Sequence, residues 1–194
     1  MVGKTHIVFG LTTLAVANAA TDFIQPHPVK EIPVGPVFCI GAVILGALLP
    51  DLDAEDSQIQ HELGEVGLAL SNWLQAWGIE HRGLTHYGVT TLVVMALSGL
   101  LSWWLGYLDV GLAFGLGYLS HVLADSLTIA GTPLLWPWVK EQRFHLLPPA
   151  MRIRTGGPVE PLIFILVTII LVFLLPSLVP VELFSIVSMM SDER

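Results

Sequence analysis

Long apolar runs constrain what this chain can fold into more than any other feature of its sequence. A helix needs about 17–25 mostly apolar residues to cross a bilayer. Five segments reach or approach this length, and we expect each to form a transmembrane helix: 6–23, 34–49, 87–108, 110–130 and 159–175. The sequence therefore predicts an all-α fold, a polytopic membrane helical bundle of about five transmembrane helices.

The composition supports a bilayer as the solvent of these segments. Hydrophobic residues make up 54% of the 194 residues and charged residues only 12%, whereas soluble domains are about 25% charged. A net charge of −8 without clusters of Lys or Arg argues against nucleic-acid binding. The single cysteine, Cys39, excludes an internal disulfide and a cysteine-based zinc site. We interpret residues 1–194 as one membrane-embedded domain whose first apolar run is a helix, not a signal peptide.

Two shorter segments are expected at the membrane surface. Residues 65–78 are apolar at roughly helical spacing within the polar connection 51–86, so we expect a half-buried or interfacial helix there. Residues 181–190 are too few to span a bilayer, so we expect an interfacial helix or an extension of the fifth helix. A second polar connection, 131–158, precedes the fifth helix.

The distribution of Lys and Arg orients the bundle. If the N-terminus is cytoplasmic, both polar connections are cytoplasmic too, and they bring six basic residues to that side: Lys4, Arg82, Lys140, Arg143, Arg152 and Arg154. Only Lys30 and Arg194 then lie outside. Because cytoplasmic loops carry the excess of Lys and Arg, we expect a multi-pass protein with a cytoplasmic N-terminus.

This topology gathers seven His and Asp residues at the cytoplasmic side. These candidate metal ligands are His6, Asp51, Asp53, His81, His86, His121 and Asp125. His121 and Asp125 are four residues apart, so they share one face of the fourth helix. Asp51 and Asp53 follow a helix C-terminus, where the helix dipole disfavours carboxylates unless a cation binds them. In an extended segment these two carboxylates point to opposite sides and serve two ions, or one ion and one supporting hydrogen bond.

Each of these motifs also has an interpretation without a metal. His6 alone is compatible with a simple helix start, and residues 48–53 with the beginning of a polar loop. The pair His121 and Asp125 is compatible with a hydrogen bond buried in the membrane, where an ionised Asp costs at least about 2.5–3.5 kcal/mol near the centre. Metal ligation is the better interpretation, because other ligand types converge on the same side.

Further residues near these motifs are candidates for catalysis. In HRGLTH (81–86), Gly83 permits a turn and Thr85 is placed to cap the third helix. Arg82 is suited to hold a phosphate or carboxylate, or else to anchor the helix at the membrane surface. Glu160 opens the fifth helix, where an acid is favoured in any case, and is a candidate ligand or general base. His27 falls on the opposite face and is expected to play no part.

The number and types of candidate ligands define the expected metal. Seven residues exceed the three or four protein ligands that one zinc ion needs. We therefore expect one to three divalent ions. Mixed imidazole and carboxylate ligands suit zinc first, with manganese and iron as alternatives, over magnesium or calcium.

The order of these motifs matches a known family. His6, LLPDLD (48–53) with Ser57, HRGLTH (81–86) and GYLSHVLADSLTIAGTPLLWP (117–137) resemble bacterial inner-membrane proteins described as metal-dependent hydrolases. One member of that family is regulated by the LexA repressor in the DNA-damage response. The resemblance covers residues from about 1 to 160 and implies an all-α fold, a divalent-metal site, phosphoester hydrolysis and a location in the bacterial inner membrane.

That family is in turn distantly similar to zinc-dependent phospholipase C and the S1/P1 nucleases. Those all-helical enzymes hold a cluster of zinc ions with His and Asp/Glu ligands and cleave phosphodiesters. In them the free N-terminus helps to bind metal. Here Met1 precedes His6 by five residues and offers no match, so we expect His6 to replace that ligand, or the ligand to be absent.

Three functions are compatible with the sequence. The first is a hydrolase at the cytoplasmic membrane face, acting on a small phosphoester or a lipid, with the bilayer as its surroundings and no obligate protein partner. The second is a transporter for a metal ion or proton, since intramembrane His and Asp residues also mark such pathways. The third is a membrane scaffold in which the metal is purely structural.

Overall fold

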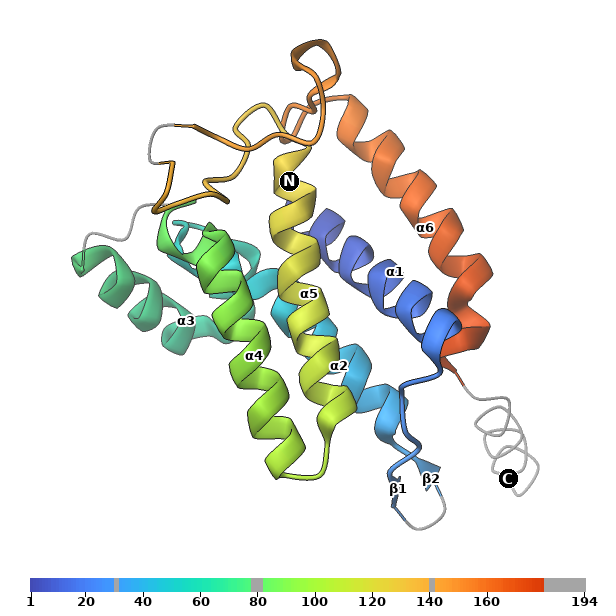
Figure 1. The fold of residues 1–194 in the computed structure, drawn as a ribbon. Helices are drawn as coiled ribbons and strands as arrows, with labels where there is room; N and C mark the ends of the chain where they lie inside the picture. The colour runs from blue at the N-terminus through green and yellow to red at the C-terminus, as the bar shows by residue number, and fades with distance from the viewer. Residues whose placement is uncertain (30–31, 78–81, 140–141, 180–194) are drawn as a thin grey trace.

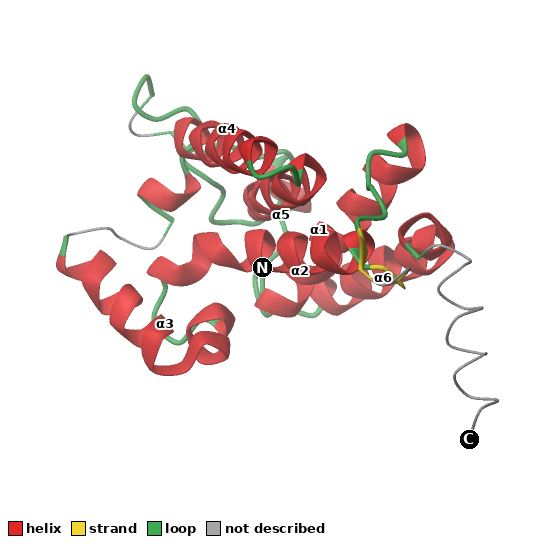
Figure 2. Ribbon diagram, turned by 90° about the horizontal axis from the view of Figure 1, so that it is seen from below, coloured by secondary structure: helices red, strands yellow, loops and turns green. Residues whose placement is uncertain are grey.

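The computed structural model describes residues 1–29, 32–77, 82–139 and 142–179. Five long helices form the bundle: α1 (Gly3–Thr21), α2 (Gly35–Leu48), α4 (Gly88–Trp104), α5 (Leu108–Ser126) and α6 (Val159–Leu178). A sixth helix, α3 (Gln58–Ala76), extends to one side (Figures 1 and 2). Two residues each of β1 (Pro28–Val29) and β2 (Ile32–Pro33) pair as an antiparallel hairpin. The predicted all-α fold is confirmed, and each of the five apolar runs contains a helix.

The five-span topology is not confirmed. By length and composition, two segments of the described chain could cross a membrane, Gly35–Asp53 and Val159–Leu178. α4 is apolar and has 17 residues, at the short end of the range that can cross a bilayer. α1 and α5 have 19 residues each, but they carry the polar residues of the candidate site. Because neighbouring helices surround α5 in the bundle, its surface need not be apolar all round.

Short 3-10 helices link the long ones on the side of the candidate site. We expected the second helix to end near residue 49, and the chain instead continues from α2 into η1 (Leu49–Asp53). Pro50 is tolerated because it lies in the first turn of η1, where its missing N–H costs no hydrogen bond. The expectation of an extended segment there was wrong. Two more such helices are η2 (Leu84–His86) and η3 (Pro149–Met151).

α5 lies at the centre of the bundle and packs against α1, α2 and α4, while α6 packs on α1 (Figure 1). Glycines bring α2 and α5 into backbone contact. A Cβ at Gly46 would lie 2.1 Å from the carbonyl oxygen of Phe114, and one at Gly117 would lie 2.2 Å from that of Val43. This close approach fixes how far the C-terminal half of α5 stands from the end of α2.

Five helix ends meet at one end of the bundle, which we call the cluster end. They are the starts of α1, α4 and α6 and the ends of α2 and α5, joined by η1 and η2. The opposite end carries the β-hairpin and the short turn between α4 and α5 (Figure 1). Between the two ends lies an apolar core that includes Leu14, Cys39, Val43 and Ala113, all fully buried.

Candidate metal centre

Four of the expected ligands converge at the cluster end: Asp51 from η1, His86 from η2, and His121 and Asp125 from α5. One ligand atom of each lies within 4.8 Å of all the others. The Nε2 atoms of His86 and His121 are 3.2 Å apart. His121 Nε2 lies 3.4 Å from Asp51 Oδ1, and His86 Nε2 lies 3.6 Å from Asp125 Oδ2. We call these residues the four-residue cluster.

The spacing of the four-residue cluster is close to that of the ligands around a tetrahedral zinc ion, and on average slightly wider. Ligands about 2.0–2.2 Å from zinc in a tetrahedral site lie roughly 3.3–3.6 Å from one another. The five pairs of ligand atoms with individual distances range from 3.2 to 3.9 Å. Three members are fully buried, while the Asp51 side chain is 16% exposed. The donor set and its spacing therefore suit one divalent cation, with Asp51 on the accessible side.

Backbone contacts orient the His121 ring. Its Nδ1 lies 2.6 Å from the carbonyl oxygen of Ala47. A carbonyl can only accept, so Nδ1 must carry the proton, and in the neutral ring Nε2 then offers a lone pair to the cluster. This tautomer is the one that a metal ligand requires.

A chain of hydrogen bonds orients the His86 ring in the same way. The Thr85 hydroxyl donates to Asp53 Oδ2 at 2.5 Å and lies 2.9 Å from His86 Nδ1. Because the hydroxyl proton is directed at the carboxylate, His86 Nδ1–H donates to Thr85 and Nε2 faces the cluster. Tyr118 donates from its hydroxyl to the Thr85 carbonyl at 2.5 Å. We expected Thr85 to cap α4, and this prediction was wrong. Tyr87 holds the N-cap position instead, and its side chain makes no capping hydrogen bond.

Asp53 therefore has a different place from Asp51. Its side chain is buried and lies behind His86, reached through Thr85. We considered that the two carboxylates of η1 serve two ions, or one ion and one supporting hydrogen bond. The structure has the second arrangement, with Asp51 as the candidate ligand and Asp53 as the supporting acceptor. In a 3-10 helix of three residues per turn, positions two apart point in different directions, which separates the two side chains.

The two oxygens of Asp125 face different groups. Oδ2 faces the four-residue cluster and lies 2.9 Å from Arg82 Nε. This oxygen is buried and accepts no well-directed hydrogen bond from the described residues. Its contact with Arg82 is an ion pair, and a buried carboxylate gains from each further partner. A cation at the cluster would add a second one.

Asp125 Oδ1 faces the start of the chain. The Met1 amino group donates to it at 2.5 Å, and His6 Nε2 lies 3.3 Å away. The His6 ring stacks on the His121 ring, with centroids 3.7 Å apart and planes 12° from parallel. His6 therefore lies beside the four-residue cluster. We expected Met1 to contribute nothing here, and the structure instead brings its amino group against a candidate ligand.

The Arg82 side chain points into the protein and contacts residues of the site. Its guanidinium pairs with Asp125 through Nε and donates from Nη1 to Thr128 Oγ1 at 3.1 Å. The side chain is 10% exposed. These contacts make Arg82 an anchor for Asp125. His81, the other His of the same motif, lies outside the described residues.

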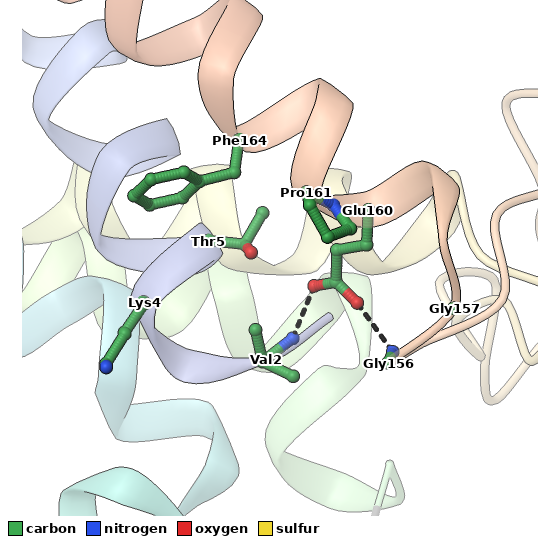
Figure 3. A pocket seen from close by; sticks show the side chains of 8 residues that line it. All are labelled: Val2, Lys4, Thr5, Gly156, Gly157, Glu160, Pro161 and Phe164. Atoms are coloured by element: carbon green, nitrogen blue, oxygen red, sulfur yellow. Dashed lines mark hydrogen bonds between the residues drawn. The ribbon is translucent and has the colours of Figure 1, made fainter.

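Glu160 ties two backbone segments together (Figure 3). Its Oε1 accepts the N–H of Val2 at 2.7 Å, and its Oε2 accepts the N–H of Gly156, also at 2.7 Å. The carboxylate borders a mainly apolar cavity of about 340 Å³ between the starts of α1 and α6, which Phe164 also lines. It does not belong to the four-residue cluster. The geometry gives Glu160 a clamping contact at the start of the chain.

A second polar contact, partly buried, lies at the opposite end of the bundle and involves His27, which we expected to play no part. His27 Nε2 is 2.8 Å from Asp109 Oδ1, and the backbone N–H of Gln25 donates to Asp109 Oδ2 at 3.0 Å. Asp109 is 3% exposed and opens α5. The signal available in the sequence was an acid in the first turn of a helix. It gave no hint of which residues would approach it.

The sequence was compared with protein families, with curated proteins and with solved structures. The family model described as YdjM inner membrane protein matches residues 1–188. The inner membrane proteins YdjM of Escherichia coli K12 and Shigella flexneri are each 37% identical over 112 residues, which is 57% of this chain. The matched region spans 55% of those proteins, about half their length. The uncharacterized protein YvsG of Bacillus subtilis 168 is 25% identical over 163 residues, 84% of this chain and 87% of that protein. No solved structure matches significantly.

Proposed function

The chain belongs to the YdjM inner membrane protein family, and we propose that it is a metal-dependent hydrolase of the bacterial inner membrane. The observation that carries the proposal is the four-residue cluster, whose ligand atoms lie within 4.8 Å of one another. Its two imidazoles are oriented from behind by Ala47 and Thr85. The Nε2 lone pairs of His86 and His121 are therefore directed at one point. A His–Asp pair with a purely structural role does not require this arrangement.

Some residues of the site are proposed to bind the ion, and others orient these ligands. His86, His121, Asp51 and Asp125 hold the ion, and Arg82 keeps Asp125 in place through its ion pair. A divalent ion bound there supplies a Lewis acid for a phosphoryl oxygen and lowers the pKa of a bound water toward neutrality. Asp51 is the partly exposed member, so a substrate would approach from its side.

Phosphoesters, including phospholipid head groups, are the proposed substrates, and zinc is the proposed metal. Mixed imidazole and carboxylate ligands favour zinc, manganese or iron, and the site lies in a protein whose family belongs to the inner membrane. The excess of Lys and Arg in the connections at the cluster end supports a multi-pass topology with the N-terminus and the site in the cytoplasm. A lipid or small phosphoester could reach the site from that side.

The test compares two Asp variants of the protein purified in nanodiscs. Asp51→Asn removes a ligand charge while keeping the side-chain shape. Asp56→Asn is the matched control, because Asp56 pairs with His61 at the surface, where both side chains are exposed. With zinc or manganese, we expect turnover of a phosphodiester or phospholipid by the wild type and Asp56→Asn, with at least a tenfold loss in Asp51→Asn. Equal turnover by all three proteins, or no metal in any, would refute the proposal.

Transport of a metal ion or proton is the second candidate. The partly buried pair of His27 and Asp109 at the opposite end favours it, because a pathway needs polar groups at more than one depth. The apolar core between the two ends argues against it. Uptake of zinc or protons into proteoliposomes distinguishes transport from hydrolysis. A structural metal would show a different pattern again: its removal would lower the unfolding temperature of a protein without activity.

A further inference from the structure

α3 presents an apolar stripe that nothing in the described chain covers. Beyond a kink at Gly64, where φ is 56° and ψ is −131°, the helix continues to Ala76. Val66, Leu70, Trp73 and Trp77 follow one another at spacings of four, three and four residues, so they share one face. Their exposed fractions are 63%, 41%, 57% and 72%. We call these four residues the α3 stripe.

A neighbouring face of α3 is already occupied. Gly67 and Ser71 are buried, and Leu74 packs into an apolar cluster with Leu52 and Ile59. Leu52 lies in η1, between the two carboxylates discussed above. The helix is therefore held to η1 by one face, while the α3 stripe faces away from the protein. Figure 2 shows α3 extending sideways from the bundle.

We propose that the α3 stripe inserts into the lipid head-group region of the membrane on the side of the cluster end. The part of α3 after the kink has too few residues to cross a bilayer, which requires about 17–25. A strongly amphipathic helix of this kind lies in the plane of the interface. Trp73 and Trp77 are the residue type enriched at that depth, with ring centroids 5.9 Å apart on the α3 stripe.

The surroundings favour lipid over other occupants. The chain belongs to an inner membrane family, and α3 starts after a four-residue connection from η1, beside the cluster end of the bundle. α3 carries Glu62 before the kink and Glu65 after it, and it has no Lys or Arg. Attraction to anionic lipids therefore contributes nothing, and insertion of apolar side chains carries the contact. The proposed insertion of the α3 stripe does not depend on whether the protein is a hydrolase.

The experiment measures the depth of single positions on α3. In a Cys39→Ala background, a nitroxide is attached to Val66→Cys or Leu70→Cys on the α3 stripe. Glu65→Cys and Asn72→Cys, which lie on another face of the same helix, are the matched controls. All four positions are exposed, so the substitutions remove no packing. The proteins are placed in nanodiscs of phosphatidylethanolamine and phosphatidylglycerol, and collisions with oxygen and with a water-soluble nickel complex are compared.

We expect the ratio of oxygen to nickel collisions to be several-fold higher at the two stripe positions than at the two controls. An equal ratio at all four positions would overturn the proposal, because the α3 stripe would then face water. Strong spin–spin broadening confined to the stripe positions would overturn it as well, because a second copy of the chain would then cover the stripe. The unfolding temperature of each labelled protein, compared with the unlabelled one, checks that the bundle is intact.

Discussion

Replacing Gly117 by Ala tests whether the contact between α2 and α5 sets the geometry of the metal centre. The added Cβ would lie 2.2 Å from the carbonyl oxygen of Val43 and 2.9 Å from the backbone nitrogen of Ala47. Both neighbours are backbone atoms of α2, so no side chain can rotate away. His121 lies one turn further along α5 and bonds the Ala47 carbonyl at 2.6 Å. The same displacement therefore reaches a candidate ligand.

The expected magnitude follows from that overlap. Real Cβ atoms essentially never approach another atom closer than 3.0 Å, so the two backbones must separate by about 1 Å, and overpacking of this kind costs typically about 1–3 kcal/mol. Loosening the bond that orients a metal-ligating His costs about 10–100-fold in metal affinity. We expect both losses together in Gly117→Ala.

The assay is zinc titration against a competing chelator, with unfolding followed in the same detergent. Gly41→Ala is the matched control, because Gly41 also lies in a bundle helix and no atom beyond its own stretch of helix backbone lies within 4 Å of its added Cβ. In that variant we expect unchanged affinity and stability equal to or up to about 1 kcal/mol above the wild type. Wild-type affinity and stability in Gly117→Ala would refute the reasoning. So would equal damage in both variants.

Three further predictions concern the surroundings of the cluster. Thr85→Val breaks the link between His86 and Asp53, so we expect zinc affinity to fall by about 10–100-fold, measured by the same titration; unchanged affinity would remove Thr85 from the site. Glu160→Ala removes the carboxylate that accepts from two part-buried backbone N–H bonds, so the free energy of unfolding should drop by about 1–3 kcal/mol in total, and denaturant unfolding showing no drop would contradict the clamp. Lowering the pH should weaken zinc binding, because protons compete for the imidazoles and carboxylates; titrations at several pH values showing constant affinity would argue that zinc binds elsewhere.

The sequence by itself determined the helices and part of the site. Long apolar runs can satisfy their backbone hydrogen bonds in a membrane only as helices. The sequence therefore predicted a helix in each of the five runs, and the structure has one in each. The spacing of His121 and Asp125 placed them on one face of α5, because residues four apart meet on any helix. Local periodicity was sufficient for both conclusions.

Only the tertiary structure decided which polar groups meet. Spacing within one segment says nothing of distances between segments. It could not show that Asp51 reaches the cluster while Asp53 reaches Thr85, or that the Met1 amino group meets Asp125. Nor could it show that Glu160 clamps two backbone N–H groups. Those contacts depend on how closely α2 and α5 approach, and that distance is set by two glycines whose effect appears only when the helices are packed together.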